Sequence, residues 1–375
     1  MRMVARIPAA TTFTLPPVSA RWVLLGLLFA IVAFMTAYPT LLMFISSFQV
    51  NRPGQPVVWG LDAWRAALGD PSLVAALGNT FLLAGIRTAI VTGVAIFFAW
   101  VVTRTDTPCK GLIEFMLWLG FFFPQLPMAM GWILLLDPQY GLLNSLVKTV
   151  FGVPGPFDIY GYGGIIWAHL AYGASIRFLL ITPAFRAMDA ALEEAARTSG
   201  ASPGRTLRSI IIPILAPAIV AAVALGIIRA LQSFEIEMVL GIPVGIYVYS
   251  TKMWDYIHWE PPMYGPATAL SSVFLLMIFA LVWTQRVIIG RRDYTTITGR
   301  SYSVRPVSIG RWRWVTFAVC IVWIGVMILL PLAFLLLGTF MRLFGFFDVA
   351  DPWTLRHWAS AFDDPIFTTS LRNTL

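Results

Sequence analysis

WVTFAVCIVWIGVMILLPLAFLLLGTFM, residues 314–341, is a run of 28 residues without one charged side chain. A helix rises 1.5 Å per residue, so about 20 residues cross a hydrocarbon core of about 30 Å. This stretch therefore predicts a membrane-spanning helix. The rest of the chain has the same character, because 58% of its 375 residues are hydrophobic and 12% are charged, against about 25% charged in an ordinary soluble domain.

Seven apolar blocks are long enough to span a bilayer. They cover residues 22–48, 74–103, 111–136, 163–184, 209–231, 265–289 and 312–341. The first is too long for the core of a signal peptide, which has about 7 to 15 residues. A helix satisfies its own backbone groups in lipid, whereas the strands of a membrane barrel alternate polar and apolar residues. We therefore expect an all-α polytopic membrane protein with about seven transmembrane helices.

Arginine and lysine residues set the expected orientation. One alternate set of connections carries 16 of them and the other set carries six, and basic-rich connections face the cytoplasm. The N-terminus and the loops near 104–110, 185–208 and 290–311 are thus predicted to be cytoplasmic. Membrane topology also explains the net charge of +8. A nucleic-acid partner is not expected, because the sequence has no basic face with interleaved aromatic residues.

Four arginines lie in or at the ends of the spans: Arg87, Arg177, Arg229 and Arg372. A charge at mid-bilayer costs at least about 2.5 kcal/mol, so each should reach the interface, face a watery cavity or find a partner. We place Arg177 and Arg229 near cytoplasmic ends and expect both to extend to the interface. Arg87 lies deeper, and the sequence names no partner for it.

The chain begins to repeat itself near residue 312. Trp64, Asp70-Pro71 and Asn79-Thr80 recur 294 residues later as Trp358, Asp364-Pro365 and Asn373-Thr374, and Pro39 recurs as Pro331 at an offset of 292. Six spans separate the copies, so both have the same orientation and the repeat is parallel. The polar stretch 291–311 is then a cytoplasmic linker.

The loop 189–213 carries the most specific local pattern. It contains Glu193-Glu194-Ala195-Ala196, Gly200 and Ile210-Ile211-Ile212-Pro213. Acidic residues suit the first turn of a helix, Gly200 suits its C-terminal end, and Ser202-Pro203 suits the start of the next helix. The pattern predicts two short helices with a turn between them.

This spacing resembles the motif of the membrane subunits of binding-protein-dependent ATP-binding-cassette importers. That motif is Glu-Ala-Ala, three residues, Gly, nine residues, Ile, one residue, Leu-Pro. The matching positions are Glu194, Ala195, Ala196, Gly200, Ile210 and Pro213, with Ile212 in place of Leu. The resemblance implies a coupling loop that docks in a cleft of a cytoplasmic ATPase. It also implies a periplasmic solute-binding protein as partner, the bacterial inner membrane as location, and the lipid bilayer as surroundings.

The resemblance further implies a division of the chain. We expect a cytoplasmic tail at 1–21, a first permease unit of six helices at 22–290, and the start of a second unit at 312–375. Fused units of this kind are similar to the ferric-iron branch of the family, so ferric iron is the expected solute. Because the second copy stops at Leu375, we expect a longer parent protein with a second Glu-Ala-Ala loop near residue 488.

Catalysis by this chain is not expected. It has no Gly-x4-Gly-Lys-Ser/Thr loop for ATP, its histidines His169, His258 and His357 are scattered, and Cys109 and Cys320 lie far apart in separate apolar regions. We expect no cofactor and no resident metal, and we expect a separate ATPase subunit to hydrolyse ATP.

Acidic residues after the fifth span offer candidate contacts for the solute. Glu235 and Glu237 should face the outside, where their oxygens would suit a ferric ion or its chelate, although solvated loop residues are the simpler interpretation. Together with Arg87 they are candidates for the substrate pathway. Two alternatives remain: an importer of another solute such as a polyamine, thiamine or a phosphonate, or a secondary transporter driven by an ion gradient.

Overall fold

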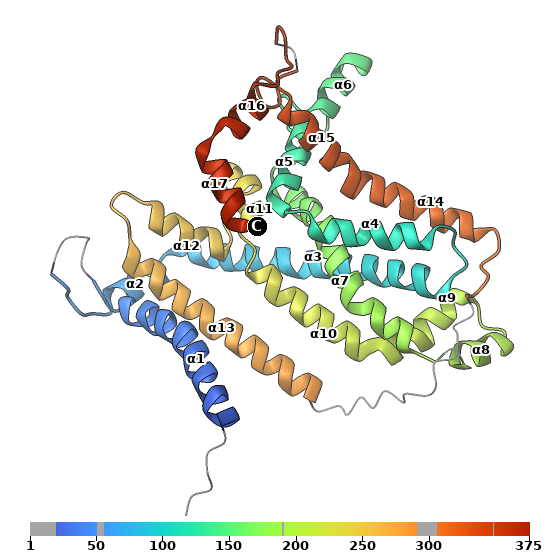
Figure 1. The fold of residues 1–375 in the computed structure, drawn as a ribbon, viewed down its shortest axis with the longest axis horizontal. Helices are drawn as coiled ribbons and strands as arrows, with labels where there is room; N and C mark the ends of the chain where they lie inside the picture. The colour runs from blue at the N-terminus through green and yellow to red at the C-terminus, as the bar shows by residue number, and fades with distance from the viewer. Residues whose placement is uncertain (1–19, 51–55, 190, 291–305, 348) are drawn as a thin grey trace, which may run out of the picture.

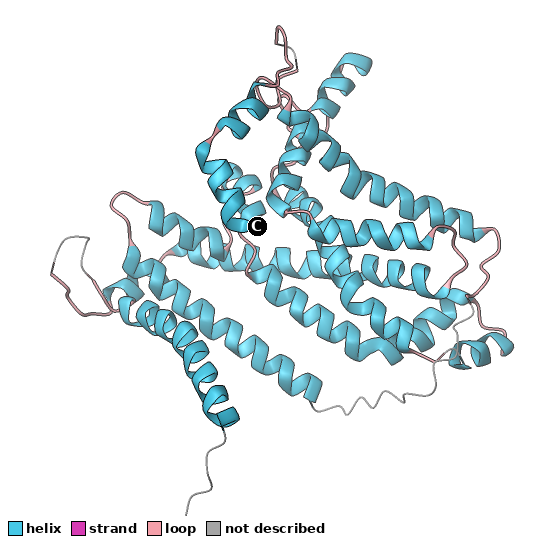
Figure 2. Ribbon diagram, in the orientation of Figure 1, coloured by secondary structure: helices cyan, strands magenta, loops and turns pink. Residues whose placement is uncertain are grey.

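A computed structural model describes residues 20–50, 56–189, 191–290, 306–347 and 349–375. All of its regular elements are helices, and extended segments within these ranges meet only at isolated bridges (Figure 2). The all-α prediction is confirmed. The expected cytoplasmic tail at 1–21 and linker at 291–311 lie mostly outside the described residues.

Six helical segments are long and apolar enough to cross a membrane. They are Arg21–Ser46, Pro71–Arg104, Tyr162–Ala187, Gly204–Leu231, Tyr264–Val287 and Trp312–Thr339. The corresponding helices are α1 (Ala20–Ser46), α3 (Pro71–Arg104), α7 (Tyr162–Ala187), α10 (Ile212–Leu231), α13 (Tyr264–Gly290), and α14 (Trp312–Ile324) continued by α15 (Leu330–Thr339) (Figure 1). Each coincides with a predicted span.

The remaining predicted span, 111–136, is broken. It consists of α4 (Lys110–Phe122) and α5 (Gln125–Leu136), which meet at an angle of 101°. Phe123 and Pro124 are extended at the break, because the proline ring disfavours helical backbone in the residue before it. The count of seven holds when this bent pair is taken as one span.

Helices α3 and α7 form the centre of the molecule. Buried residues on both pack against α4, α5, α10 and the π-helical turn at Gly325–Leu329 between α14 and α15. Two apolar clusters fill this centre, one around Trp132 and Ile165 and the other around Phe98 and Phe178. By contrast, α1 lies at the margin of the molecule beside α13 and exposes its apolar side chains, as a lipid-facing helix should.

Connections expected on the same face of the membrane meet one another. At one end, the Thr107 hydroxyl contacts that of Thr316 at 2.9 Å and Ser308 donates to Asp106 at 3.0 Å, so the 104–110 loop touches the start of α14. At the other end, α12 (Tyr249–His258) contacts the start of α3. This pairing agrees with the predicted alternation, whereas the assignment of one end to the cytoplasm stays a prediction.

Asp70 is the centre of the contact between α12 and α3. It accepts a 2.6 Å hydrogen bond from the Tyr256 hydroxyl, and Lys252 Nζ lies 3.2 Å from it. The Tyr256 bond is the main reason why the pKa of Asp70 lies well below its usual range. Asp70 also caps α3 by accepting from Ser72 N at 2.9 Å.

The segments related by the sequence repeat have the same local geometry. In α2 (Asp62–Leu68) the Trp64 indole donates to Ser47 Oγ at 3.1 Å, and in α16 (Arg356–Asp363) the Trp358 indole donates to Thr339 Oγ1 at 3.0 Å. Asp364 caps α17 (Pro365–Thr374) by accepting from the backbone of Ile366, as Asp70 caps α3. Isolated bridges Gln49 to Trp59 and Met341 to Trp353 also correspond.

Candidate functional site

The loop between α7 and α10 is a short helical hairpin. It contains α8 (Ala191–Thr198) and α9 (Pro203–Thr206), followed by the π-helical turn Leu207–Ile211 that leads into α10. Asp189 accepts a hydrogen bond from Ala191 N at 2.9 Å at the start of α8. Gly200 adopts φ +81°, a left-handed conformation that glycine adopts without steric cost. The predicted pair of short helices with a glycine turn is confirmed.

The two faces of α8 differ in exposure. Glu194 and Ala195 are exposed, whereas Glu193 and Ala196 are buried against the rest of the chain. The hairpin lies at the edge of the molecule, beside the start of α4 and the end of α3 (Figure 1). Part of the Glu-Ala-Ala segment is therefore free to contact another protein. Of the further motif residues, Ile210 is half-buried and Pro213 lies in the first turn of α10.

Arg104, the last residue of α3, holds this hairpin in place. Its Nη1 lies 2.9 Å from a carboxylate oxygen of Glu193, and its Nη2 donates to the carbonyls of Met188, at 2.8 Å, and Phe185. Arg104 is 1% exposed and Glu193 is 5% exposed. The guanidinium therefore joins α3 to the end of α7 by charge-assisted hydrogen bonds and to α8 by an ion pair.

A second polar group lies inside the helix bundle, around Glu237 of α11 (Glu235–Leu240). Arg87 Nη1 lies 3.1 Å from Glu237 Oε1, and His169 Nε2 lies 3.0 Å from the same oxygen. Ser233 donates to Glu237 Oε2 at 2.6 Å. Arg87 also donates to the Ala230 carbonyl at 2.7 Å, at the negative end of α10. Three helices, α3, α7 and α11, and the segment between α10 and α11 thus meet at one carboxylate.

This geometry corrects the expectation for Glu237. The sequence places it in an external loop facing the outside, but the side chain is 2% exposed and paired. Its neighbour Glu235 is exposed, as expected. Because α11 folds back against α7 and α5 after α10 ends, Glu237 points into the bundle. Arg87, for which the sequence names no partner, has one 150 residues away.

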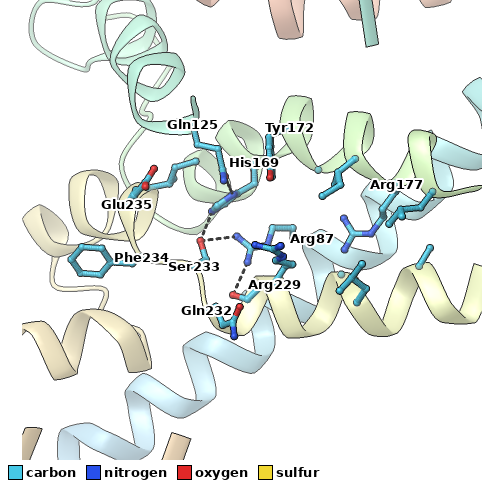
Figure 3. Close-up of a pocket in the computed structure, with 18 residues that line it drawn as sticks. Arg87, Gln125, His169, Tyr172, Arg177, Arg229, Gln232, Ser233, Phe234 and Glu235 are labelled. Carbon is cyan, nitrogen blue, oxygen red and sulfur yellow. Dashed lines mark hydrogen bonds between the residues drawn. The ribbon is translucent and has the colours of Figure 1, made fainter. Parts of the chain in front are cut away.

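A cavity of about 320 Å³ adjoins this cluster. It lies among α3, α5, α7, α10 and α11, and its lining includes Arg87, His169, Arg177, Arg229 and Glu235 (Figure 3). Of the candidate pathway residues, Arg87 and Glu235 line the cavity directly, and Glu237 contacts Arg87 and His169 of the lining. The structure thus brings all three to one place.

Two further arginines depart from expectation. Arg177 does not extend to the interface: it is 4% exposed, lines the cavity, and donates to Thr88 Oγ1 at 3.1 Å. Arg229 lies in the last turn of α10, at the end opposite the α8 hairpin, so it does not share the side of the membrane predicted for that hairpin. It is exposed and lines the same cavity.

Several site residues had no signal in the sequence. His169, Gln125 and Ser233 are isolated polar residues far apart in the sequence. Only the fold brings His169 and Ser233 to Glu237, and Gln125 to His169. For Arg104 the sequence indicates only a contribution to the positive charge of the 104–110 loop. Its burial and its link to Glu193, 89 residues away, depend on how α3 and α7 pack.

The fold is shared with bacterial ABC transporters of known structure. A chain of the bacterial alginate ABC transporter in complex with an alginate-bound periplasmic protein aligns with a TM-score of 0.55 and 17% identity, over 74% of this chain and 96% of that chain. A second structure, of a bacterial ABC transporter that imports alginate, aligns with a TM-score of 0.54 over 72% and 96%. At this identity the likeness is one of fold.

Curated relatives include ferric transport proteins. The ferric transport system permease protein FbpB of Actinobacillus pleuropneumoniae is 27% identical over 307 residues, 80% of this chain and 43% of the relative. The putative ferric transport system permease protein FbpB 1 of Haemophilus influenzae is 28% identical over 273 residues, 72% of this chain and 42% of the relative. The matches span less than half the length of these two relatives.

The family comparison covers the centre of the chain. The model of the binding-protein-dependent transport system inner membrane component matches residues 91–294, more than half of the 375. This region contains the α8 hairpin, Arg104, and Glu237 with its partners His169 and Ser233, whereas Arg87 precedes it. The chain therefore belongs to the family of inner membrane components of binding-protein-dependent transport systems.

Proposed function

We propose that this chain forms part of the membrane channel of an ATP-driven importer, with ATP hydrolysed on a separate cytoplasmic subunit and solute delivered by a periplasmic binding protein. The observation that carries the proposal is the hairpin of α8 and α9, which presents Glu194 and Ala195 on an exposed face while Arg104 fixes its inner face. A rigid element that projects from the ends of α7 and α10 is suited to pass a partner's movement to those helices.

Ferric iron is the solute we propose first. The two FbpB relatives are ferric transport proteins by name, and this chain matches them over most of its length. Molybdenum and sulfate transport permeases of Escherichia coli and Salmonella typhimurium are also similar, at 29% and 30% identity, over about half of this chain. An importer of an oxyanion is therefore the second candidate.

We further propose two permease units in parallel orientation, the first at 22–290 and the second beginning at 312. The support is the recurrence of the tryptophan contact, the aspartate cap and the isolated bridge described above. A residue pattern can recur by chance in an apolar sequence, but three matched local geometries at the matched offsets favour a real duplication.

Assembly with an ATPase tests the coupling role. Glu194→Lys reverses the charge on the exposed face of α8, and we expect it to reduce co-purification of the ATPase subunit about tenfold or more. The control is Glu260→Lys, which makes the same change at an exposed site between α12 and α13. Equal recovery of the ATPase with all three proteins would contradict the proposed docking face, and a chain that drives uptake with no ATPase bound would indicate a secondary transporter.

A further inference from the structure

The cavity beside Glu237 holds more positive than negative charge. The charge of Arg87 is balanced by Glu237, and Arg87 also donates a hydrogen bond to the Ala230 carbonyl. Within the described residues, neither Arg177 nor Arg229 has a carboxylate in ion-pair distance. Glu235, the acidic residue in the lining, is exposed. An unpaired buried charge is costly in a membrane protein, so Arg177 needs a counter-charge.

Arg177 is held in place without being satisfied. Its Nη2 donates to Thr88 Oγ1, while its buried Nε has no hydrogen-bond partner among the described residues. The guanidinium lies directly against Gly226 of α10, so a Cβ at that position would clash with Nη2. The absence of a side chain at Gly226 thus leaves space beside α10 for the Arg177 guanidinium.

The arginines are aligned along one face of α10. Arg177 lies at Gly226, Arg229 follows three residues later, and Arg87 bonds the carbonyl of Ala230. Residues three and four apart lie on the same side of a helix, about one turn or 5.4 Å along its axis. Figure 3 shows the three side chains directed toward the space between α7 and α10 (Figure 3).

We propose that this cavity binds an anionic group, a carboxylate or a tetrahedral oxyanion, with Arg177 and Arg229 as its ligands. Guanidinium groups match both shapes through paired N–H donors, and the cavity volume of about 320 Å³ suits a small solute. If the chain is part of an importer, as proposed above, it follows that the solute crosses the membrane as an anion or as an anionic metal chelate. A bare ferric cation would be repelled here.

Binding of labelled anions tests the proposal directly. The full chain, purified in phosphatidylcholine nanodiscs, is titrated with radiolabelled sulfate, with citrate and with ferric citrate. We expect saturable binding of at least one probe, weakened about tenfold or more by Arg177→Gln and by Arg229→Gln. Arg229 is exposed, so its replacement leaves the fold intact. Arg65→Gln, at an exposed arginine on α2, should bind as the unmodified chain does.

The three probes separate the possible ligands. Binding of sulfate alone identifies a free oxyanion, whereas preference for ferric citrate over citrate identifies a metal chelate. Absence of binding by all three at millimolar concentration, or equal binding by the unmodified, Arg177→Gln and Arg229→Gln chains, would overturn the proposal. Binding that depends on the two arginines, in a chain that supports no ATP-driven uptake, would support the anion site and refute the importer function. ATP-driven uptake that is unchanged by Arg177→Gln and by Arg229→Gln would refute the anion site and leave the importer function standing.

Discussion

Arg87 and Glu237 form a buried ion pair whose two halves depend on each other. Arg87→Met would leave Glu237 charged with only His169 and Ser233 beside it, and losing one partner of a buried pair costs about 3–5 kcal/mol. We expect a clear fall in the thermal unfolding midpoint of the purified chain. The double change Arg87→Met with Glu237→Gln should recover part of the loss, because no unpaired charge remains.

The exposed pair of Arg65 and Asp62 provides the control for this cycle. Exposed ion pairs contribute about 1 kcal/mol or less, so Arg65→Gln should leave the midpoint almost unchanged. Strictly additive losses in the double variant would show that Arg87 and Glu237 do not interact in the folded protein.

Gly200 has a conformational role that can be separated from its small size. Its φ of +81° costs an ordinary residue about 1–2 kcal/mol, although the space around it is open. We expect Gly200→Val to abolish solute uptake by reconstituted vesicles while membrane insertion persists. Gly200→Asn should keep part of the uptake, since asparagine tolerates this conformation.

Gly204 offers the matched comparison for Gly200. It lies four residues away in α9, also has open space at its Cβ, and does not have a positive φ. Gly204→Val should therefore retain more uptake than Gly200→Val. An equal loss in both variants would mean that bulk in the hairpin, rather than backbone strain, is what the loop cannot accept.

At the level of helices, the sequence predicts what depends on local composition. Long apolar blocks such as Tyr264–Val287 can be recognised from sequence as helices, because a segment in lipid must satisfy its own backbone hydrogen-bonding groups. The break between α4 and α5 had a local signal in Pro124, yet a continuous span of 26 residues fitted a bilayer equally well. The cluster around Glu237 had no local signal, since its members come from three helices and a connecting segment, and Arg87 is 150 residues from its partner.

Arg104 connects α3 to the α8 hairpin, and its shape matters as well as its charge. A lysine keeps the positive charge but lacks the planar, forked guanidinium with which Arg104 contacts Glu193 and two backbone carbonyls at once. We expect Arg104→Lys to increase hydrogen exchange in α8 and to lower solute-stimulated ATP hydrolysis several-fold. ATPase subunits should still co-purify, because the exposed face of α8 is unchanged.

Arg186→Lys is the appropriate comparison for Arg104→Lys. Arg186 also lies at the end of α7 and pairs with Glu114 at 2.7 Å, but its side chain is 55% exposed, so water can replace what the lysine loses. Similar exchange in the two variants would indicate that Arg104 is only one of many contacts holding the hairpin.

Across the whole molecule, the repeat and the charge bias together predict one orientation. Connections at 104–110 and 185–208 meet at one end, whereas α2 and the contact of α12 with Asp70 lie at the other. If the repeat is parallel, α16 must share the side of α2, since their tryptophan contacts and aspartate caps match. The predicted orientation rests on the content of arginine and lysine at the two ends.

Cysteine labelling in intact cells tests that orientation. In a chain with Cys109→Ser and Cys320→Ser, we introduce Asp62→Cys on α2, His357→Cys on α16 or Ser199→Cys beside Gly200, all at exposed positions. A membrane-impermeant maleimide should label the first two from outside and the third only after the cells are opened. Labelling of α2 and α16 from opposite sides would refute a parallel repeat. Labelling of both from inside would keep the repeat and invert the orientation, placing the α8 hairpin where no cytoplasmic ATPase reaches it.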